Sequence, residues 1–250
     1  MIKFFRKIRY DHMSENKTVK YLKYAFGEIV LVAIGILIAL GVNNWNENRK
    51  NVSTEHKYLI ALLEDFETNL TKSKEIIERI EDDIPQLIGL LEQSALEKST
   101  IPVDSLNNAF AKVSNMPTYS STDRTYNNLV GSGELKIIND ESLKTNLANY
   151  YKSLYILNLV QQTHESELVQ SFQPFIIEYL DFQAVRPLII KEFPLPGSLE
   201  TTKILEVMKT RRFRNIVALK LTILADLLDL NRNLESINQT IVDQLGQRIL

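Results

Sequence analysis

The sequence predicts an all-α protein with one N-terminal transmembrane helix followed by an extracytoplasmic bundle of long helices. An apolar run covers residues 25–42 and contains a single charged residue. Positive charge is concentrated before this run. Beyond it, apolar residues recur every three or four positions, which is the spacing of one helix face. No stretch shows the alternation over six residues, bounded by turn dipeptides, that is typical of a strand.

The apolar run is long enough to cross a membrane. At about 1.5 Å per residue, its length is roughly 27 Å, close to the hydrocarbon thickness of a bilayer. Tyr21 and Tyr24 precede it and Trp45 follows it, so these rings are expected to be interfacial anchors. A cleaved signal peptide would have a shorter leading region and an A-x-A site. A buried core helix would need more apolar surroundings. We therefore predict an uncleaved transmembrane helix over residues 25–45.

The flanking charges predict the orientation of the helix. Residues 1–24 contain seven Lys or Arg and two acidic residues, whereas only Arg49, Lys50 and Lys57 follow within about fifteen residues of the span. This bias predicts a cytoplasmic N-terminus and a periplasmic domain over residues 46–250. The basic segment 1–24 is either an interfacial helix held by anionic headgroups or a basic tail without fixed structure.

Three blocks of sequence carry a resemblance to a known family. They are M-I-K-F-F-R-K-I-R at 1–9, K-Y-L-K-Y-A-F-G-E-I-V-L-V-A-I-G-I-L-I-A-L at 20–40 and N-N-W-N-E at 43–47. Together they resemble the opening of a family of uncharacterised bacterial single-span inner-membrane proteins, and T-Y-N-N-L-V-G-S-G-E-L-K-I-I-N-D at 125–140 is similar to its middle region. Gly41 departs from that pattern, which has a polar residue there. The resemblance implies a bacterial inner (cytoplasmic) membrane, a periplasmic body and no assigned activity.

Two long stretches of the exported region follow a heptad-like pattern typical of a helical bundle or coiled coil. Pro85 lies within the first and is expected to kink the helix or to start a new one capped by Asp82 or Asp83. A shorter helix is expected after Pro102, capped by Asp104. The predicted core positions are Leu59, Leu63, Phe66, Leu70, Ser73, Ile77, Ile80, Ile84, Leu87 and Leu91 in the first stretch, and Ile216, Leu219, Ile223, Leu227, Leu230, Leu234, Ile237, Ile241 and Leu245 in the second.

Two other segments interrupt these helices. In residues 117–140, Thr122 is predicted to cap a short helix and Asp140 the next one. This segment is either a structural corner or a partner-facing loop that presents Arg124 and Tyr126. Residues 172–197 combine four prolines with many apolar residues. They predict a connection packed across the bundle or, alternatively, a surface for a membrane or a partner.

Catalytic and metal-binding motifs are absent from the sequence. It has no cysteine and three histidines, and it contains no metalloprotease, phosphate-loop or nucleophile-elbow motif. His164 and Glu167 are interpreted as a surface pair on a helix, since two ligands do not make a metal site. We therefore predict no enzymatic activity, no catalytic residue, no metal and no cofactor. Neither nucleic acid nor a small-molecule ligand is expected.

These observations favour a membrane-anchored periplasmic scaffold or protein-interaction module. Its expected partners are the lipid bilayer and other protein, through self-association or a partner subunit. The alternative is a subunit of an ion-conducting or force-transducing membrane assembly, in which Glu28 acts within the span. Glu28, Gly35 and Ala39 fall on one stripe of the helix, and Gly35-x-x-x-Ala39 is a small-xxx-small packing pattern.

Overall fold

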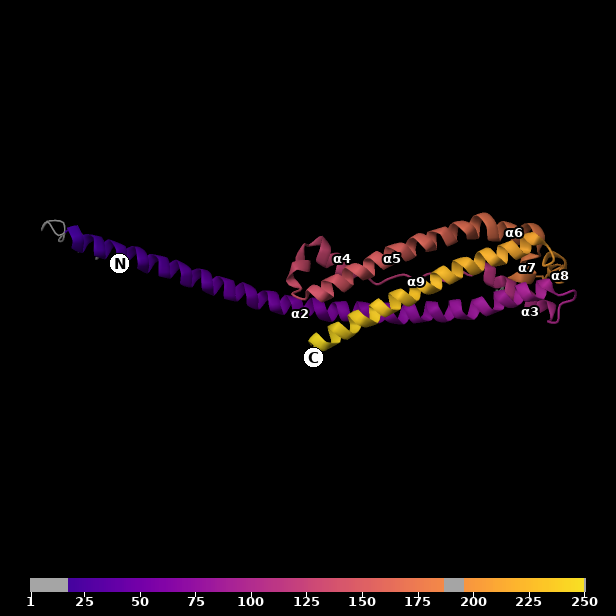
Figure 1. Cartoon of the computed structure of the whole chain (residues 1–250), viewed down its shortest axis with the longest axis horizontal. Coiled ribbons are helices and arrows are strands. Elements are labelled where there is room, and N and C mark those ends of the chain that lie inside the picture. Colours follow the sequence, from indigo (N-terminus) through magenta and orange to yellow (C-terminus); the bar gives the residue numbers. More distant parts are fainter. Residues whose placement is uncertain (1–17, 187–195, 250) are drawn as a thin grey trace. The chain divides into compact units, whose positions relative to one another are not determined.

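The chain is all-α, as predicted from the sequence (Figure 1). The computed structural model describes residues 18–186 and 196–249, and contains no strand within those ranges. It divides into two compact units, Met1–Lys57 and Tyr58–Leu250. Helix α2 (Thr18–Ala95) contributes residues to both units. Most of the predicted basic segment 1–24 lies outside the described residues.

The described part of the first unit is the beginning of α2. All side chains from residue 26 to residue 57 are exposed or half-buried, and those of the apolar stretch 26–42 are all exposed. Among the described residues, α2 is the one helix that is long and apolar enough, by length and composition, to cross a membrane. The predicted transmembrane segment therefore lies in a helix that could hold it.

The second unit is built on three long helices. They are the part of α2 from Tyr58 onward, α5 (Glu141–Glu167) and α9 (Arg211–Ile249). Helices α5 and α9 run antiparallel and side by side (Figure 1). Hydrogen bonds fix their register: Asn146 bonds Gln244 at 2.9 Å, and Asn233 bonds Ser153 at 3.3 Å. An ion pair from Arg232 of α9 to Glu81 of α2, at 2.6 Å, links the third helix.

Each long helix presents one buried seam to the others, with alternating spacings of three and four residues. This spacing keeps one face of a helix towards its neighbours. The buried seam residues are Leu59, Leu62, Phe66, Asn69, Ser73, Ile76, Ile80, Asp83, Leu87, Leu90 and Ser94 of α2, Leu143, Leu147, Tyr150, Leu154, Leu157, Gln161 and His164 of α5, and Phe213, Val217, Lys220, Leu224, Leu227, Asn231, Leu234, Asn238, Ile241 and Leu245 of α9.

The seam of α2 differs from the predicted one at alternate positions. Leu59, Phe66, Ser73, Ile80 and Leu87 are buried as predicted. Of the apolar residues predicted between them, Ile77 is also buried, whereas Leu63, Leu70, Ile84 and Leu91 are only half-buried. The polar neighbours Asn69 and Asp83 are buried in place of Leu70 and Ile84. The reason is that both polar side chains find hydrogen-bond partners inside the unit.

Pro85 does not start a new helix, because α2 continues through it to Ala95. Asp82 and Asp83 therefore lie inside a helix, and the prediction that they cap one is wrong. Their carboxylates instead bind Lys112 at 3.0 and 2.9 Å.

Shorter elements connect the long helices. They are α3 (Val103–Ala111), the 3-10 helix η1 (Lys112–Ser114), α4 (Arg124–Gly131), the 3-10 helix η2 (Glu134–Ile137), the π-helix η3 (Leu168–Phe172), α6 (Gln173–Tyr179), α7 (Phe182–Val185) and α8 (Ile204–Val207). Helices α3, α6, α7 and α8 gather at one end of the second unit (Figure 1). The ring of Phe110 stacks there on Phe213, with centroids 4.9 Å apart, and Phe175 adjoins both.

Helix caps were predicted with partial success. Asp140 caps α5 as predicted, because its carboxylate accepts the N–H of Ser142 at 2.8 Å. The predicted cap Thr122 is wrong by one residue, since Asp123 occupies the N-cap of α4. Asp104 lies in the first turn of α3, whose N-cap is Pro102.

The predicted connection over residues 172–197 is partly described. Phe172, Phe175 and Ile176 are buried in the unit, whereas Ile177 is exposed. The prolines and apolar residues between 187 and 195 lie outside the described residues.

Candidate functional site

An extended segment, residues 115–123, lies against the seams of the long helices. We call it the strap. It follows η1 and leads into α4, and it belongs to no helix. Pro117 and Tyr119 are buried within it, whereas Thr118 and Ser120 are exposed. A buried extended segment must have partners for its backbone N–H and C=O groups, and without neighbouring strands these must be side chains.

Two side-chain amides supply those partners. Each amide binds both the N–H and the C=O group of one residue of the strap. Asn69 accepts the N–H of Thr122 at 2.6 Å and donates to its carbonyl at 2.8 Å. Gln161 accepts the N–H of Tyr119 at 2.6 Å and donates to its carbonyl at 3.3 Å. The seam positions of α2 and α5 therefore serve the strap as an adjacent strand would in a sheet.

A polar layer crosses the second unit beside the strap. The hydroxyl groups of Tyr119 and Tyr150 are hydrogen-bonded at 2.7 Å. Asn238 of α9 donates to the hydroxyl of Ser73 at 3.2 Å. Burial raises the pKa of both tyrosines above the usual value, and in Tyr150 the neighbouring Tyr119 raises it further. These phenols are held neutral in the folded protein.

The most unusual group in the second unit is the amine of Lys220. This seam residue of α9 is fully buried, although lysine is seldom buried unless it is paired. Its Nζ donates to the backbone carbonyl of Asn115, the first residue of the strap, and to Nε2 of His164 at 2.5 Å. It also lies 5.6 Å from the ring centre of Phe172. Phe172 ends the π-helix, a type of element frequently found at functional sites.

Burial shifts the pKa of both members of this Lys220–His164 pair downward. Loss of solvation lowers the pKa of His164 to about 4, and the adjacent Lys220 lowers it further in the same direction. Loss of solvation lowers the pKa of Lys220 to about 7, against an opposing effect of the Asp83 carboxylate. At pH 7 His164 is therefore neutral and accepts the hydrogen bond.

A chain of polar contacts joins the pair to the surface. Asn115 donates from Nδ2 to both carboxylate oxygens of Asp83, at 2.9 and 3.2 Å. Lys112 binds the same carboxylate and that of the exposed Asp82. These four residues border an open groove that Glu75, Glu78 and Arg186 also line. Lys220 and His164 themselves lie behind the wall of that groove.

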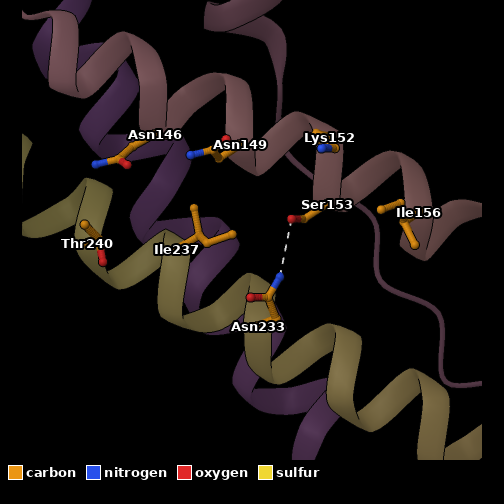
Figure 2. Close-up of a pocket in the computed structure, with 8 residues that line it drawn as sticks. All are labelled: Asn146, Asn149, Lys152, Ser153, Ile156, Asn233, Ile237 and Thr240. Atoms are coloured by element: carbon orange, nitrogen blue, oxygen red, sulfur yellow. Dashed lines mark hydrogen bonds between the residues drawn. The ribbon is translucent and has the colours of Figure 1, made fainter.

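A second groove runs between α5 and α9. Figure 2 shows its lining, in which amide and hydroxyl side chains face each other across the two helices and one hydrogen bond joins Asn233 to Ser153. Ile156 and Ile237 are its apolar members, and Lys152 its charged one. Next to it, Tyr155, Ile156 and Leu159 are exposed on consecutive turns of α5.

The predicted residues of the span all lie in α2. Glu28, Gly35 and Ala39 are exposed in the first unit, as are Tyr24 and Trp45, whereas Tyr21 is half-buried. A Cβ atom built on Gly35 would meet nothing within 4 Å. The face that holds these residues is therefore available to lipid or to another helix.

Arg124 and Tyr126, the predicted partner-facing pair, both lie in α4 but in different environments. Arg124 is exposed. Tyr126 is half-buried and stacks on Tyr151, with ring centroids 3.8 Å apart. The structure therefore leaves Arg124 accessible to a partner and uses the ring of Tyr126 within the second unit.

The interpretation of His164 and Glu167 as a surface pair is wrong for the histidine. His164 is 1% exposed, and it faces Lys220. Glu167 is half-buried and accepts a hydrogen bond from Ser171 at 2.6 Å. Within residues 18–186 and 196–249, no group of three His, Asp or Glu side chains has a geometry that could hold a metal ion.

The sequence analysis missed Lys220 and the strap. A signal for Lys220 existed, because it occupies a seam position between Val217 and Leu224, one helical turn from each. We chose Leu219 for that seam because it is apolar, but it is exposed. No comparable signal marks the strap, whose partners lie 31 or more residues away along the chain.

A protein-family profile matches residues 28–171, which is 144 of the 250 residues. The chain belongs to DUF6090, a family of unknown function. The resemblance to an uncharacterised family is thereby confirmed at the level of the family. The DUF6090 match covers most of the apolar stretch, the strap and α5, but ends before α9 and Lys220. No curated protein and no solved structure matches the chain.

Proposed function

We propose that this DUF6090 protein is a membrane-anchored scaffold that binds other protein through its periplasmic helical unit. The observation that carries the proposal is the exposed apolar stretch of α2. Its side chains from residue 26 to residue 42 are exposed in the first unit. So long an apolar surface is stable only in lipid or against another apolar surface.

The charge bias around that stretch supports a periplasmic location for the second unit. Seven Lys or Arg precede the stretch and three follow it closely. Cytoplasmic flanks carry the excess of positive charge in inner-membrane proteins. The N-terminus is then cytoplasmic, and the bundle lies in the periplasm of a bacterium.

The second unit supports a binding role over an enzymatic one. Its buried polar groups Asn69, Gln161 and Lys220 bind the strap, and so serve the protein's own backbone. Its outer surface offers an apolar patch on α5, formed by Tyr155, Ile156 and Leu159. Such patches, rimmed by polar residues, are typical of protein-binding surfaces.

The experiment places a photoreactive amino acid at Leu159 of the full-length chain in native membranes. We expect one defined partner protein to crosslink, identified by mass spectrometry. A matched variant carries the same group at Glu165, which is exposed about 120° away around α5 at 100° per residue. Crosslinking only to lipid, or the same random products from both positions, would contradict a scaffold that uses this face.

A subunit of an ion-conducting or force-transducing assembly is the second candidate, because Glu28 lies within the exposed apolar stretch. An ionisable residue inside a membrane usually faces protein or water. The mass of the detergent-solubilised complex separates the two proposals. A ring of several copies of this chain favours the assembly, whereas one copy with a different protein favours the scaffold.

A further inference from the structure

The Lys220–His164 pair holds one end of the strap through a contact that depends on a neutral histidine. Nζ of Lys220 reaches the carbonyl of Asn115 from one side and Nε2 of His164 from the other. Below its pKa of about 7, Lys220 is an ammonium group with donors only, so Nε2 must then supply the lone pair. In that state His164 carries its proton on Nδ1.

Protonation of His164 makes this arrangement impossible. Both ring nitrogens would then be donors, and an imidazolium would face the Lys220 amine at a hydrogen-bonding distance. Both side chains are almost completely buried, so little water screens two positive charges placed there. It costs less free energy for one cation to leave the site. Lys220 can leave only if its hydrogen bond to the carbonyl of Asn115 breaks.

The charges around the pair do not compensate for a second cation. From α2, the carboxylate of Asp83 faces the site, but it already binds Lys112 of η1 at 2.9 Å and the amide of Asn115. On α9, the residues one turn from Lys220 are apolar, and the π-helix contributes the ring of Phe172. On α5, Glu165 is exposed and Glu167 binds Ser171.

We propose that the Lys220–His164 pair is an acid-sensitive release for the strap, in which protonation of His164 displaces Lys220 from the carbonyl of Asn115 and leaves that end of the segment held by the Asn115 side chain on Asp83. Asn115 also lines the groove bordered by Asp83 and Lys112. Release therefore changes the shape of a surface groove in response to the pH of the surrounding compartment. The other end of the strap stays paired with Asn69.

The direction of the response follows from the pKa values. The pKa of His164 is lowered to about 4 by burial and by Lys220, below the usual value of about 6.5. With the strap bound, His164 is therefore protonated at a lower pH than in the released or unfolded form. The bound state loses stability as the pH falls from about 6.5 towards 4, and keeps it at neutral pH.

The test uses the absence of cysteine from the chain. Met116, half-buried beside Asn115 on the strap, and Gln162, exposed on α5, are replaced by cysteine for spin labels in the full-length protein held in lipid nanodiscs. We expect a single narrow distance distribution at pH 7.5. At pH 4.5 we expect a second, broader population, which grows over about two pH units as His164 titrates.

Three variants in the same labelled background decide the cause. His164→Gln keeps an acceptor but cannot titrate, and it should remove the acid response. His56→Gln, at an exposed position of α2, should respond as the unsubstituted protein does. Lys220→Met removes the donor to Asn115 and should broaden the distribution already at pH 7.5. If Lys220→Met does not fold, the two histidine variants still decide.

The imidazole NMR signal of His164 provides the second readout, since it should titrate well below the usual value of about 6.5. The proposal is overturned if His164→Gln retains the acid response, because another group, such as Lys220 or a carboxylate, would then be its cause. It is also overturned if His164 titrates in the unsubstituted protein while the strap distances stay unchanged.

Discussion

Asn69 and Thr122 are 53 residues apart in sequence and are joined by two hydrogen bonds, in which one side-chain amide satisfies both backbone groups of the other residue. The pair joins the strap to α2 within the second unit. It explains why a polar residue occupies a core position of α2, because an apolar side chain there would leave the backbone of Thr122 without partners.

Asn69→Leu should therefore destabilise the protein, although it adds apolar volume to the core. Two partly buried backbone groups would lose their partners, and the loss for a buried group costs about 1–3 kcal/mol. We expect the free energy of unfolding, measured by urea denaturation, to fall by about 2–4 kcal/mol. Asn127→Leu, on an exposed face of α4, should change it by less than about 0.5 kcal/mol. Equal effects of the two substitutions would contradict the role of the paired amide.

Tyr150 predicts an alkaline loss of stability. Its pKa is raised by burial and by Tyr119, so it stays neutral in the folded protein while the unfolded chain ionises above about pH 10. The free energy of unfolding should then fall by about 1.4 kcal/mol per pH unit for this residue above that pH. Lys220 acts oppositely: with its lowered pKa it adds stability as the pH rises from about 7 to 10.5.

Measurements between about pH 10.5 and 11.5 avoid the contribution of Lys220, and the contributions of Tyr119 and Tyr151, whose pKa values burial also raises, are shared by the proteins compared. Tyr150→Phe should reduce the slope of stability against pH by about 1.4 kcal/mol per unit. Tyr155→Phe, on the exposed face of the same helix, should leave the slope as it is. A slope unaffected by Tyr150→Phe would show that this phenol ionises equally well in the folded protein.

The charge bias around the apolar stretch predicts the location of the C-terminus. A reporter active only in the periplasm, fused after Leu250, should be active, and one active only in the cytoplasm should be silent. Replacing Lys17, Lys20 and Lys23 by Gln should increase the fraction of inverted molecules. Activity of the cytoplasmic reporter in the unsubstituted protein would reverse the orientation.

The stripe of Glu28, Gly35 and Ala39 predicts association within the membrane. Gly35→Leu or Ala39→Leu should weaken crosslinking between spans in native membranes, and Ile36→Leu should not. A side chain added at Gly35 meets nothing within 4 Å in the first unit, so any effect must arise from another molecule. Equal crosslinking in all three variants would identify this face as lipid-exposed.

The second unit is predicted to fold without the span. A fragment covering residues 51–250 should be soluble, with a far-ultraviolet circular dichroism spectrum dominated by helix and a single cooperative unfolding transition. Its core and strap contacts all lie within residues 58–249. A spectrum dominated by strand or coil would contradict the helical bundle as an independent domain.

The periodicity of apolar residues was sufficient to predict the fold class and the long helices α2 and α9, whereas α5 was expected only from its cap, Asp140. It predicted the register of α9 correctly at Leu227, Leu234, Ile241 and Leu245, where the seam residues are apolar. It failed at Asn69, Asp83 and Lys220, because hydropathy assigns polar side chains to the surface. Their burial depends on partners in the strap or η1, 30 to 105 residues away. Spacing along one helix contains no information about such partners.

The candidate site was therefore the part of the molecule least accessible to sequence reasoning. His164 was assigned to the surface because a lone histidine beside Glu167 resembles a solvated pair. Its neighbour Lys220 lies 56 residues later, in α9. The predicted seam of that helix contained Leu219 in place of Lys220. A lysine at a seam position between apolar residues is the one clue to this site in the sequence.

The contact between Lys220 and Asn115 also determines when this part of the protein can fold during its synthesis. A ribosome produces Asn115 of the strap 105 residues before Lys220 of α9, the helix that completes the three-helix seam. Until then, the carbonyl of Asn115 lacks the donor that it has in the finished protein, and the polar layer of Ser73 lacks Asn238. A chain that stops short of α9 would thus be a natural substrate for proteases, since non-local contacts form only once both partners have been made.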